Sequence, residues 1–140
     1  MKVKRLDTDD LAMLVSTVRS FKGREISAGH AQDFLADPRH FVIVAETGGE
    51  PVGFLLAYRL ERMDRPSAKM FIYEIEVAEA HRRKGMGTSL IGAIREIVRR
   101  EGLMNAFVLT NHSNEGAVAF YKSTGGRIEN GDDLMFVYPN

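Results

Sequence analysis

Two carboxylates in an otherwise apolar run, Glu74 and Glu76, are the first residues that could do chemistry. The run 70–77 is rich in β-branched and aromatic residues, which predicts a largely buried strand in the middle of a sheet. The i, i+2 spacing puts both carboxylates on one face unless a bulge intervenes. A poorly solvated carboxylate at a cleft is suited to act as a general base. The alternative is that one or both pair with Arg or Lys at a strand end.

A basic stretch with two glycines follows this strand. Residues 81–87 read HRRKGMG, and from Thr88 apolar residues recur at spacings of three and four, which predicts an amphipathic helix that ends near Gly102. Glycines let the backbone curl closely around a ligand, and the free N–H groups of a helix start stabilise anions. The glycine spacing fits neither a P-loop nor a dinucleotide fingerprint. The stretch predicts a phosphate-binding turn, with a solvated basic turn as the alternative.

A second segment whose residues could take part in a reaction follows a short predicted strand over 106–110. A predicted helix begins at Asn114, contains Tyr121 and stops at the glycine pair 125–126. Asn114 could act only as a helix cap, which is a common role for asparagine. Tyr121 could be a packed helix residue with a satisfied hydroxyl, or a proton donor.

These two segments, in this order, resemble the GNAT superfamily of N-acetyltransferases. The first matches its pyrophosphate loop for acyl-CoA, as Arg82-x-x-Gly85-x-Gly87, and the second matches its later motif, as Asn114, Ala117, Phe120, Tyr121 and Gly125. The resemblance implies that acetyl-CoA lies in a cleft between two splayed strands. The residues that it implies for cofactor binding are Val77, Arg82, Arg83, Lys84, Gly85, Met86, Gly87, Thr88, Asn114, Ala117 and Tyr121.

A narrower resemblance covers nearly the whole chain. Residues 41–58, 60–66 and 71–83 look like the gentamicin-type aminoglycoside 3-N-acetyltransferases, and 21–25 is similar to their Phe-Gly-Arg-Glu segment with one extra lysine. This resemblance implies acetyl-CoA-dependent acetylation of the 3-amino group of an aminoglycoside by direct transfer, with antibiotic resistance as the consequence.

The same resemblance assigns three catalytic roles. A free amine must attack a thioester, so a base, an N–H donor and an acid would each help. Glu74 and Glu76 are the candidate bases, and only Glu74 matches an acidic position in the aminoglycoside enzymes. The N–H donor is main chain just after a bulge in the fourth strand, near Val77, and the acid that protonates the leaving thiolate is Tyr121.

A polycationic acceptor would need several carboxylates, each contributing modestly. Asp132 and Asp133 could instead form only a hairpin turn. The carboxylates that we predict to bind the acceptor are Glu25, Glu74, Glu76, Asp132 and Asp133.

Composition is consistent with one small enzyme. The 140 residues fit a single domain, 1–140, with zero formal net charge and no cysteine. Zero net charge gives no support for nucleic-acid binding, and the lack of cysteine excludes a cysteine acyl-enzyme. Four scattered histidines show no metal spacing. With no membrane-length apolar run and no secretory-type apolar start, we expect a cytoplasmic protein without membrane partners, and relatives suggest a possible homodimer.

The remaining pattern predicts a mixed α/β sheet of about seven strands and four helices. Asp7 or Thr8 would cap the first helix, and a turn at Asn130-Gly131-Asp132 would join the last two strands. The predicted strands are 3–6, 41–46, 52–58, 70–77, 106–110 and a closing pair within 127–138. The predicted helices are 9–21, 28–36, the one after Thr88 and the one after Asn114.

Two other functions stay open from the sequence. The first is a GNAT enzyme for a polyamine, another small amine or a peptide N-terminus. The second is a CoA-binding module without catalysis, against which the presence of both Glu74 and Tyr121 argues.

Overall fold

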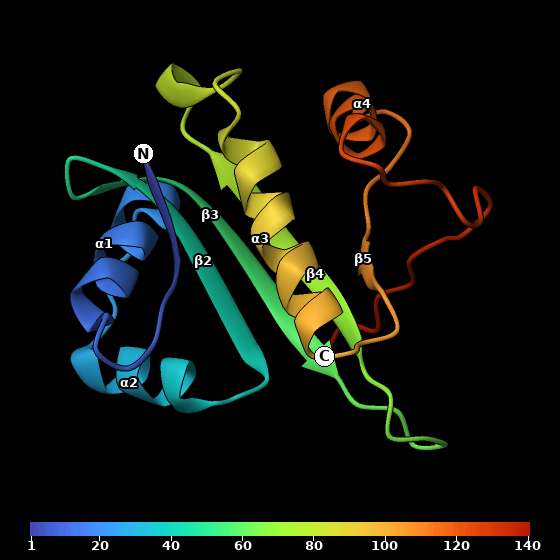
Figure 1. Cartoon of the computed structure of the whole chain (residues 1–140), viewed down its shortest axis with the longest axis horizontal. Helices are drawn as coiled ribbons and strands as arrows, with labels where there is room; N and C mark the ends of the chain where they lie inside the picture. The colour runs from blue at the N-terminus through green and yellow to red at the C-terminus, as the bar shows by residue number, and fades with distance from the viewer. The chain divides into compact units, whose positions relative to one another are not determined.

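A computed structural model describes residues 1–140, which form two compact units, 1–109 and 110–140. The first unit holds the sheet and three α-helices, and the second holds one α-helix (Figure 1). In chain order the elements are β1 (Lys2–Arg5), α1 (Leu11–Lys22), α2 (Ala28–Ala36), β2 (His40–Thr47), β3 (Glu50–Leu60), β4 (Lys69–Val77), the 3₁₀ turn η1 (Glu79–His81), α3 (Met86–Arg100), β5 (Ala106–Val108) and α4 (Glu115–Ser123).

The strands form one sheet in the order β1-β2-β3-β4-β5. Neighbours from β1 to β4 are antiparallel, and β5 runs parallel to β4. The α/β class with a mixed sheet is therefore confirmed, and so are the four α-helices. The prediction of seven strands is wrong, because the sheet has five.

The hairpin of β2 and β3 forms the centre of the sheet. Thr47 pairs with Glu50 across a two-residue turn, Gly48-Gly49, in which both residues have positive φ. Only glycine adopts these angles readily, and such turns match the twist of the flanking strands. The sequence predicts both strands, and they extend beyond the predicted 41–46 and 52–58.

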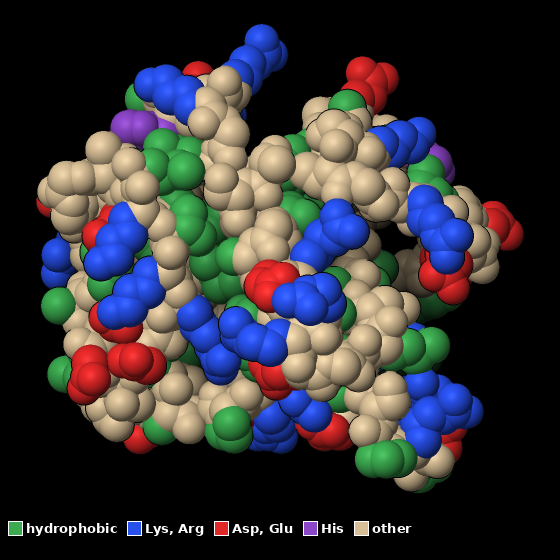
Figure 2. Space-filling view, viewed as in Figure 1, with side chains coloured by type: hydrophobic (Ala, Val, Ile, Leu, Met, Phe, Trp, Pro, Cys, Tyr) green, Lys and Arg blue, Asp and Glu red, His purple; other side chains and the backbone are tan.

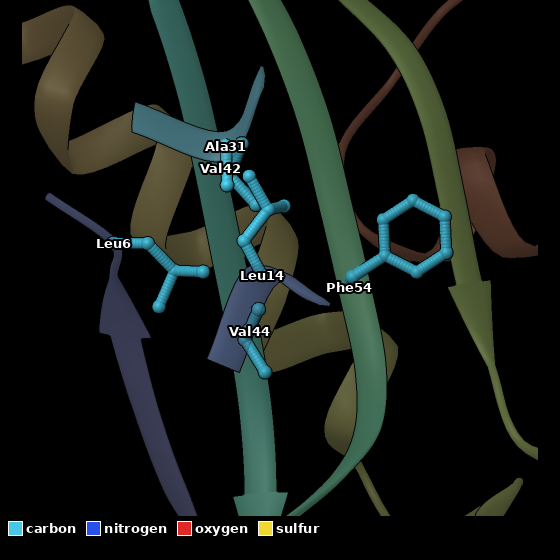
Figure 3. Close-up of a cluster of buried hydrophobic side chains, with 6 residues drawn as sticks. All are labelled: Leu6, Leu14, Ala31, Val42, Val44 and Phe54. Carbon is cyan, nitrogen blue, oxygen red and sulfur yellow. The ribbon is translucent and has the colours of Figure 1, made fainter. Parts of the chain in front are cut away.

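One face of the sheet packs against α1 and α2. Leu14 from α1 and Ala31 from α2 meet Val42, Val44 and Phe54 from β2 and β3 (Figure 3). All of these side chains are at most 6% exposed. Burial of each large apolar side chain contributes about 1.5–3 kcal/mol, so this cluster fixes the two helices on the sheet.

The opposite face carries α3, whose apolar stripe includes the fully buried Leu90 and Ile94. A Cβ on Gly53 of β3 would lie 3.4 Å from Leu90 Cδ1 and 3.3 Å from the Glu76 carbonyl oxygen, so glycine permits the close approach of helix and sheet. None of the α-helices has the length and apolar character needed to cross a membrane.

The start of α1 differs from the prediction of a cap at Asp7 or Thr8. Asp10 stands at the N-cap position without a side-chain cap bond. Its carboxylate instead accepts hydrogen bonds from Lys4 Nζ at 2.7 Å and from the Asp7 N–H at 2.9 Å. Competition from these partners moves the helix start to Leu11.

The second unit contains α4 and an extended C-terminal segment. Asn114 caps α4, because its Oδ1 accepts from the Ala117 N–H at 3.1 Å. The prediction of two closing strands within 127–138 is wrong. The apolar run 134–138 has strand-like composition, but strands need a hydrogen-bonded partner, and none pairs with this segment. At the predicted turn, Asn130 Oδ1 accepts from the Asp132 N–H at 3.1 Å, which closes a local side-chain turn instead of a hairpin.

Candidate active site

A bulge in β4 sets which way the two carboxylates face. Leu56 of β3 pairs with Glu74, whereas Ala57 pairs with Ile72, so Tyr73 is the extra residue. The bulge precedes Glu74, and pairing is regular from there to Val77. Glu74 and Glu76 therefore share the face of the sheet that carries α1 and α2, as the spacing predicts. The bulge itself lies four residues before Val77, earlier than we expected.

The two carboxylates have different surroundings. Glu74 Oε2 accepts a hydrogen bond from Lys22 Nζ at the end of α1, with both side chains partly exposed. Glu76 is half-buried and has no side-chain hydrogen bond or ion pair. The expectation that one carboxylate pairs with a basic residue thus applies to Glu74. Glu76 is the carboxylate that is free to accept a proton.

A cavity of about 210 Å³ lies between α1, α2 and the sheet, next to Glu74. Its walls are mostly aliphatic and aromatic. Thr17 is buried, and its hydroxyl donates to the Met13 carbonyl at 2.7 Å. The lining residues are Leu14, Thr17, Val18, Phe21, Lys22, Ile26, His30, Phe34, Val42, Phe54, Leu56 and Glu74. The ionisable side chains of this cavity are the paired Lys22 and Glu74 and the imidazole of His30.

The end of β4 exposes main-chain hydrogen-bonding groups. The Ala78 N–H donates to the Val52 carbonyl at 2.8 Å. Antiparallel pairs alternate between hydrogen-bonded and non-hydrogen-bonded, so the next residue, Val77, points its N–H and C=O away from β3. In agreement, the Val77 carbonyl accepts from Arg82 Nε at 3.0 Å.

This outer edge of β4 is not covered by β5. Pairing between the two strands runs from Met70–Ala106 to Ile72–Val108 and stops there. From Glu74 to Val77, β4 therefore pairs with β3 only, and the Val77 N–H points to the open side. The predicted N–H donor near Val77 would lie on this open side of β4.

The N-terminus of α3 has unpaired N–H groups that could bind an anion. Gly85 is the N-cap residue at φ 81°, and no side chain caps the helix. The first helical bond runs from the Ser89 N–H to the Gly85 carbonyl, so the N–H groups of Met86, Gly87 and Thr88 have no intrahelical partner. Three free N–H groups at the positive end of a 15-residue helix form a phosphate-sized site.

The basic residues of the loop have different roles in this geometry. Arg82 ties the loop to β4 through Val77, and all three basic residues are exposed. Lys and Arg side chains gather over this loop in the space-filling view (Figure 2). Arg83 also has φ 62°, an uncommon conformation for a residue with a side chain and one that clusters at functional sites. Met86 is 6% exposed. Of Met86, therefore, only the main chain can contribute to anion binding.

Three predicted residues lie in the second unit. Asn114 caps α4 and bonds to the Ala117 N–H, which confirms the capping role. Tyr121 is half-buried within α4, and this burial raises the pKa of its hydroxyl. A tyrosine with a raised pKa stays protonated at neutral pH, as a proton donor must. A Cβ on Gly126 would lie 2.8 Å from the Tyr121 carbonyl oxygen, so only glycine fits the turn after the helix.

The other predicted acceptor carboxylates are exposed, and Glu25 is not among the residues that line the cavity. Glu25 follows α1 and accepts two hydrogen bonds from Arg19, one of them at 2.9 Å from Nη2, which lowers the pKa of Glu25. Asp132 and Asp133 lie in the extended segment of the second unit, where Asp132 takes part in the local turn. An observed hydrogen bond thus supports a turn role for Asp132, and no observed contact supports a binding role.

The sequence interpretation missed Lys22. Leu14, Val18 and Lys22 are spaced by four residues, which places the lysine on the same face of α1 as two cavity residues. A cation at the end of an apolar helix stripe is the signal that could have identified it.

Acyl transfer from a phosphate-bearing donor to an amine requires a site for the phosphate, a donor for the carbonyl oxygen and a base. The free N–H groups of α3, the open edge of β4 and the two carboxylates could fill these roles. Sequence comparison agrees with this class. The profile of the acetyltransferase (GNAT) family matches residues 11–125. The chain belongs to this family, whose enzymes use acetyl-CoA.

Solved structures with the same fold include aminoglycoside acetyltransferases. One, from an uncultured soil metagenomic sample and bound to trehalose, is 27% identical with a TM-score of 0.91, over 99% of this chain and 95% of that chain. The enzyme of the same name in complex with sisomicin gives 26% identity and a TM-score of 0.85, over the same shares of the two chains. An aminoglycoside N-acetyltransferase in complex with CoA, 16% identical with a TM-score of 0.77 over 99% of both chains, shows the common fold.

Among curated proteins, N-acetyltransferase 8 of Rattus norvegicus is 28% identical over 96 residues. The match covers 67% of this chain and 42% of that protein. The chain thus spans less than half the length of the curated relatives that it first matches.

Proposed function

We propose that this chain is an acetyl-CoA-dependent N-acetyltransferase that acetylates the 3-amino group of an aminoglycoside by direct transfer and so confers resistance to it. The observation that carries the activity is the end of β4. There, an unpaired N–H at Val77 adjoins a free carboxylate at Glu76 and leads into the open N-terminus of α3.

On the donor side, the main-chain N–H groups of Met86, Gly87 and Thr88 bind the pyrophosphate of acetyl-CoA, and Arg83 and Lys84 add positive charge. Acetyl-CoA supplies the thioester that is attacked. The Val77 N–H stabilises the negative charge that develops on the thioester carbonyl oxygen.

On the acceptor side, Glu76 removes a proton from the ammonium group, directly or through one water. The neutral nitrogen then attacks the thioester carbon, a C–N bond forms and the C–S bond breaks. The nitrogen carries a positive charge after the attack and loses a second proton to water, and water returns a proton to Tyr121 after that residue has protonated the thiolate. Tyr121 donates its hydroxyl proton to the leaving thiolate. No cysteine is present, so the acetyl group does not pass through a cysteine acyl-enzyme.

We assign the base role to Glu76 and ammonium binding to Glu74. The Glu74 carboxylate already binds the ammonium group of Lys22, whereas Glu76 has no such partner. Glu74 is therefore suited to anchor a positively charged acceptor next to the base.

The aminoglycoside acceptor is supported by the likeness to the soil metagenomic aminoglycoside acetyltransferase that binds sisomicin. The carboxylates on the acceptor face suit a polycation. Glu25, Asp132 and Asp133 are further candidates to bind its other ammonium groups.

A second candidate function is acetylation of another small amine, such as a polyamine or a peptide N-terminus. The observation that favours it is the apolar lining of the cavity beside Glu74. An aminoglycoside carries hydroxyl and ammonium groups over most of its surface and gains little from such walls.

A thiol-release assay tests both candidates. Acetyl-CoA would be mixed with the chain and with gentamicin, sisomicin, kanamycin, spermidine or a short peptide, and two-dimensional NMR would locate the acetyl group on the product. We expect turnover with gentamicin and sisomicin and an acetylated 3-amino group. Turnover confined to spermidine or peptide would replace the aminoglycoside by the second candidate, and CoA binding without turnover of any amine would remove the enzymatic function.

A further inference from the structure

We propose that Glu74, the ring of Phe54 and the adjoining cavity form a subsite for a primary alkylamine, in which the Lys22 side chain acts as an internal competitor. The inference rests on the proposed function, because the bound ammonium group is the one by which Glu74 anchors the acceptor. It adds the chemical class of group that the subsite prefers, namely an ammonium group on an unbranched apolar stem.

The geometry around the Lys22 ammonium is that of an amine-binding site. Its Nζ is hydrogen-bonded to Glu74 Oε2 and lies 5.8 Å from the centroid of the Phe54 ring. A carboxylate and an aromatic face are the two groups that proteins use to bind ammonium ions. The butylammonium end of Lys22 therefore stands in for the ligand that the site would take from solution.

The cavity provides the place for the apolar stem. Its volume of about 210 Å³ exceeds the roughly 150 Å³ of a protein cavity that holds benzene. The rings of Phe21 and Phe54 pack edge to face, with 5.1 Å between their centroids. Val18 and Leu56 also line the cavity. A short alkyl chain that enters with its ammonium group at Glu74 would be removed from water on most sides.

Charge balance allows the exchange. Lys22 and Glu74 are a lysine–carboxylate pair in the cavity lining, and an entering ammonium replaces the lysine cation by another cation. Both side chains are partly exposed, at 42% and 29%, and ion pairs of this kind contribute little. Lys22 can thus move into solvent at small cost while Glu74 remains paired.

Binding of a homologous series tests the apolar stem. Propylamine, butylamine, pentylamine and hexylamine would be titrated into the full chain, with amide NMR signals of β3 and β4 as the readout. Each methylene that the cavity buries should tighten binding about fourfold. Equal dissociation constants throughout the series would overturn the proposed apolar subsite.

Substitution of the internal competitor tests the role of Lys22. Lys22→Met keeps the apolar stem and removes the charge, so amines should bind about two- to fivefold tighter, the amount by which an exposed ion pair competes. The matched control is Lys4→Met, which removes another partly exposed lysine–carboxylate pair, with Asp10, and should leave amine binding unchanged. Equal effects of the two substitutions, or weaker binding by Lys22→Met, would overturn the competitor role.

Filling the cavity gives a third readout. Val18→Phe should remove the dependence on chain length, and its folding can be checked by thermal unfolding. If this variant does not fold, the alkylamine series and the Lys22→Met comparison still decide the question. Because these measurements record binding without turnover, they can fail while aminoglycosides are acetylated, or succeed while they are not.

Discussion

The donor side and the acceptor side of the candidate site are built from different parts of the chain. The donor side uses main-chain groups, namely the N–H groups at the start of α3 and at Val77. The acceptor side uses side chains from separate elements, with Lys22 from α1, Phe54 from β3 and Glu74 from β4. All of these groups lie in the first unit of the structure.

The two sides therefore differ in how strongly a single substitution changes them. A main-chain site depends on glycine positions and helix geometry, so most substitutions leave its hydrogen bonds in place. A side-chain site changes with a single residue. A family that keeps one donor and accepts many amines needs this combination, and the two sides should therefore fail independently when substituted.

The largest expected effect is on the donor side. Gly85→Val places a β-branched residue at φ 81°, which costs about 1–3 kcal/mol and displaces the free N–H groups. We expect at least tenfold weaker binding of acetyl-CoA by calorimetry, with unchanged binding of amines. Gly92→Ala is the control, since a Cβ there meets nothing within 4 Å. Equal loss of amine binding in Gly85→Val would break the separation of the two sides.

Tyr121→Phe should affect turnover and leave binding on both sides intact. Loss of a general acid lowers kcat by about 100-fold, whereas the dissociation constant of acetyl-CoA should stay within twofold. An unchanged kcat would leave Tyr121 with a packing role only.

The pH profile gives an independent measure of Tyr121. Burial raises the pKa of its hydroxyl, so the residue remains a donor up to a pH above the usual tyrosine value of about 10. The alkaline decline of kcat should begin above that pH and should be missing in Tyr121→Phe. A decline attributable to this residue near pH 8 would contradict the assignment.

On the acceptor side, substitutions of the two glutamates should change different kinetic constants. Glu76→Gln removes the proposed base, so kcat should fall by about 100-fold. Glu74→Gln weakens the ammonium contact, so the KM of the amine should rise about tenfold, with a smaller change in kcat. Steady-state kinetics distinguishes the two, and a reversed pattern would exchange their roles.

The smallest effect is expected for Arg82→Lys. The lysine keeps the charge but loses the hydrogen bond from Nε to the Val77 carbonyl at 3.0 Å. A single exposed hydrogen bond corresponds to about a two- to fivefold increase in the KM of acetyl-CoA. Arg99→Lys, at the far end of α3 and paired with Glu96, is the control. Equal KM changes in these two variants would mean that the tie to Val77 is unimportant.

The sequence predicts the elements of the donor side well, because a strand, a turn and a helix that follow one another are encoded locally. The strand 70–77, the glycine turn and the helix are adjacent in the chain, and the structure reproduces them within two residues. The shared face of Glu74 and Glu76 also follows from local spacing, since the bulge at Tyr73 lies outside the pair.

The acceptor side is less predictable, because it depends on contacts between distant residues. Lys22 and Glu74 are 52 positions apart, and nothing local shows that they meet. The prediction of two closing strands is wrong for a related reason. The apolar run 134–138 has the composition of a strand, but composition does not determine a partner strand with which it would pair. The position of a bulge likewise depends on two strands and their register.

The most direct test of this account is the binding of acetyl-CoA and of sisomicin, each measured separately by calorimetry with the wild-type chain, Gly85→Val and Glu74→Gln. We predict that Gly85→Val loses acetyl-CoA and keeps sisomicin, and that Glu74→Gln does the reverse. If both substitutions weakened both ligands equally, or if the wild-type chain bound neither, the division into a main-chain donor side and a side-chain acceptor side would be wrong.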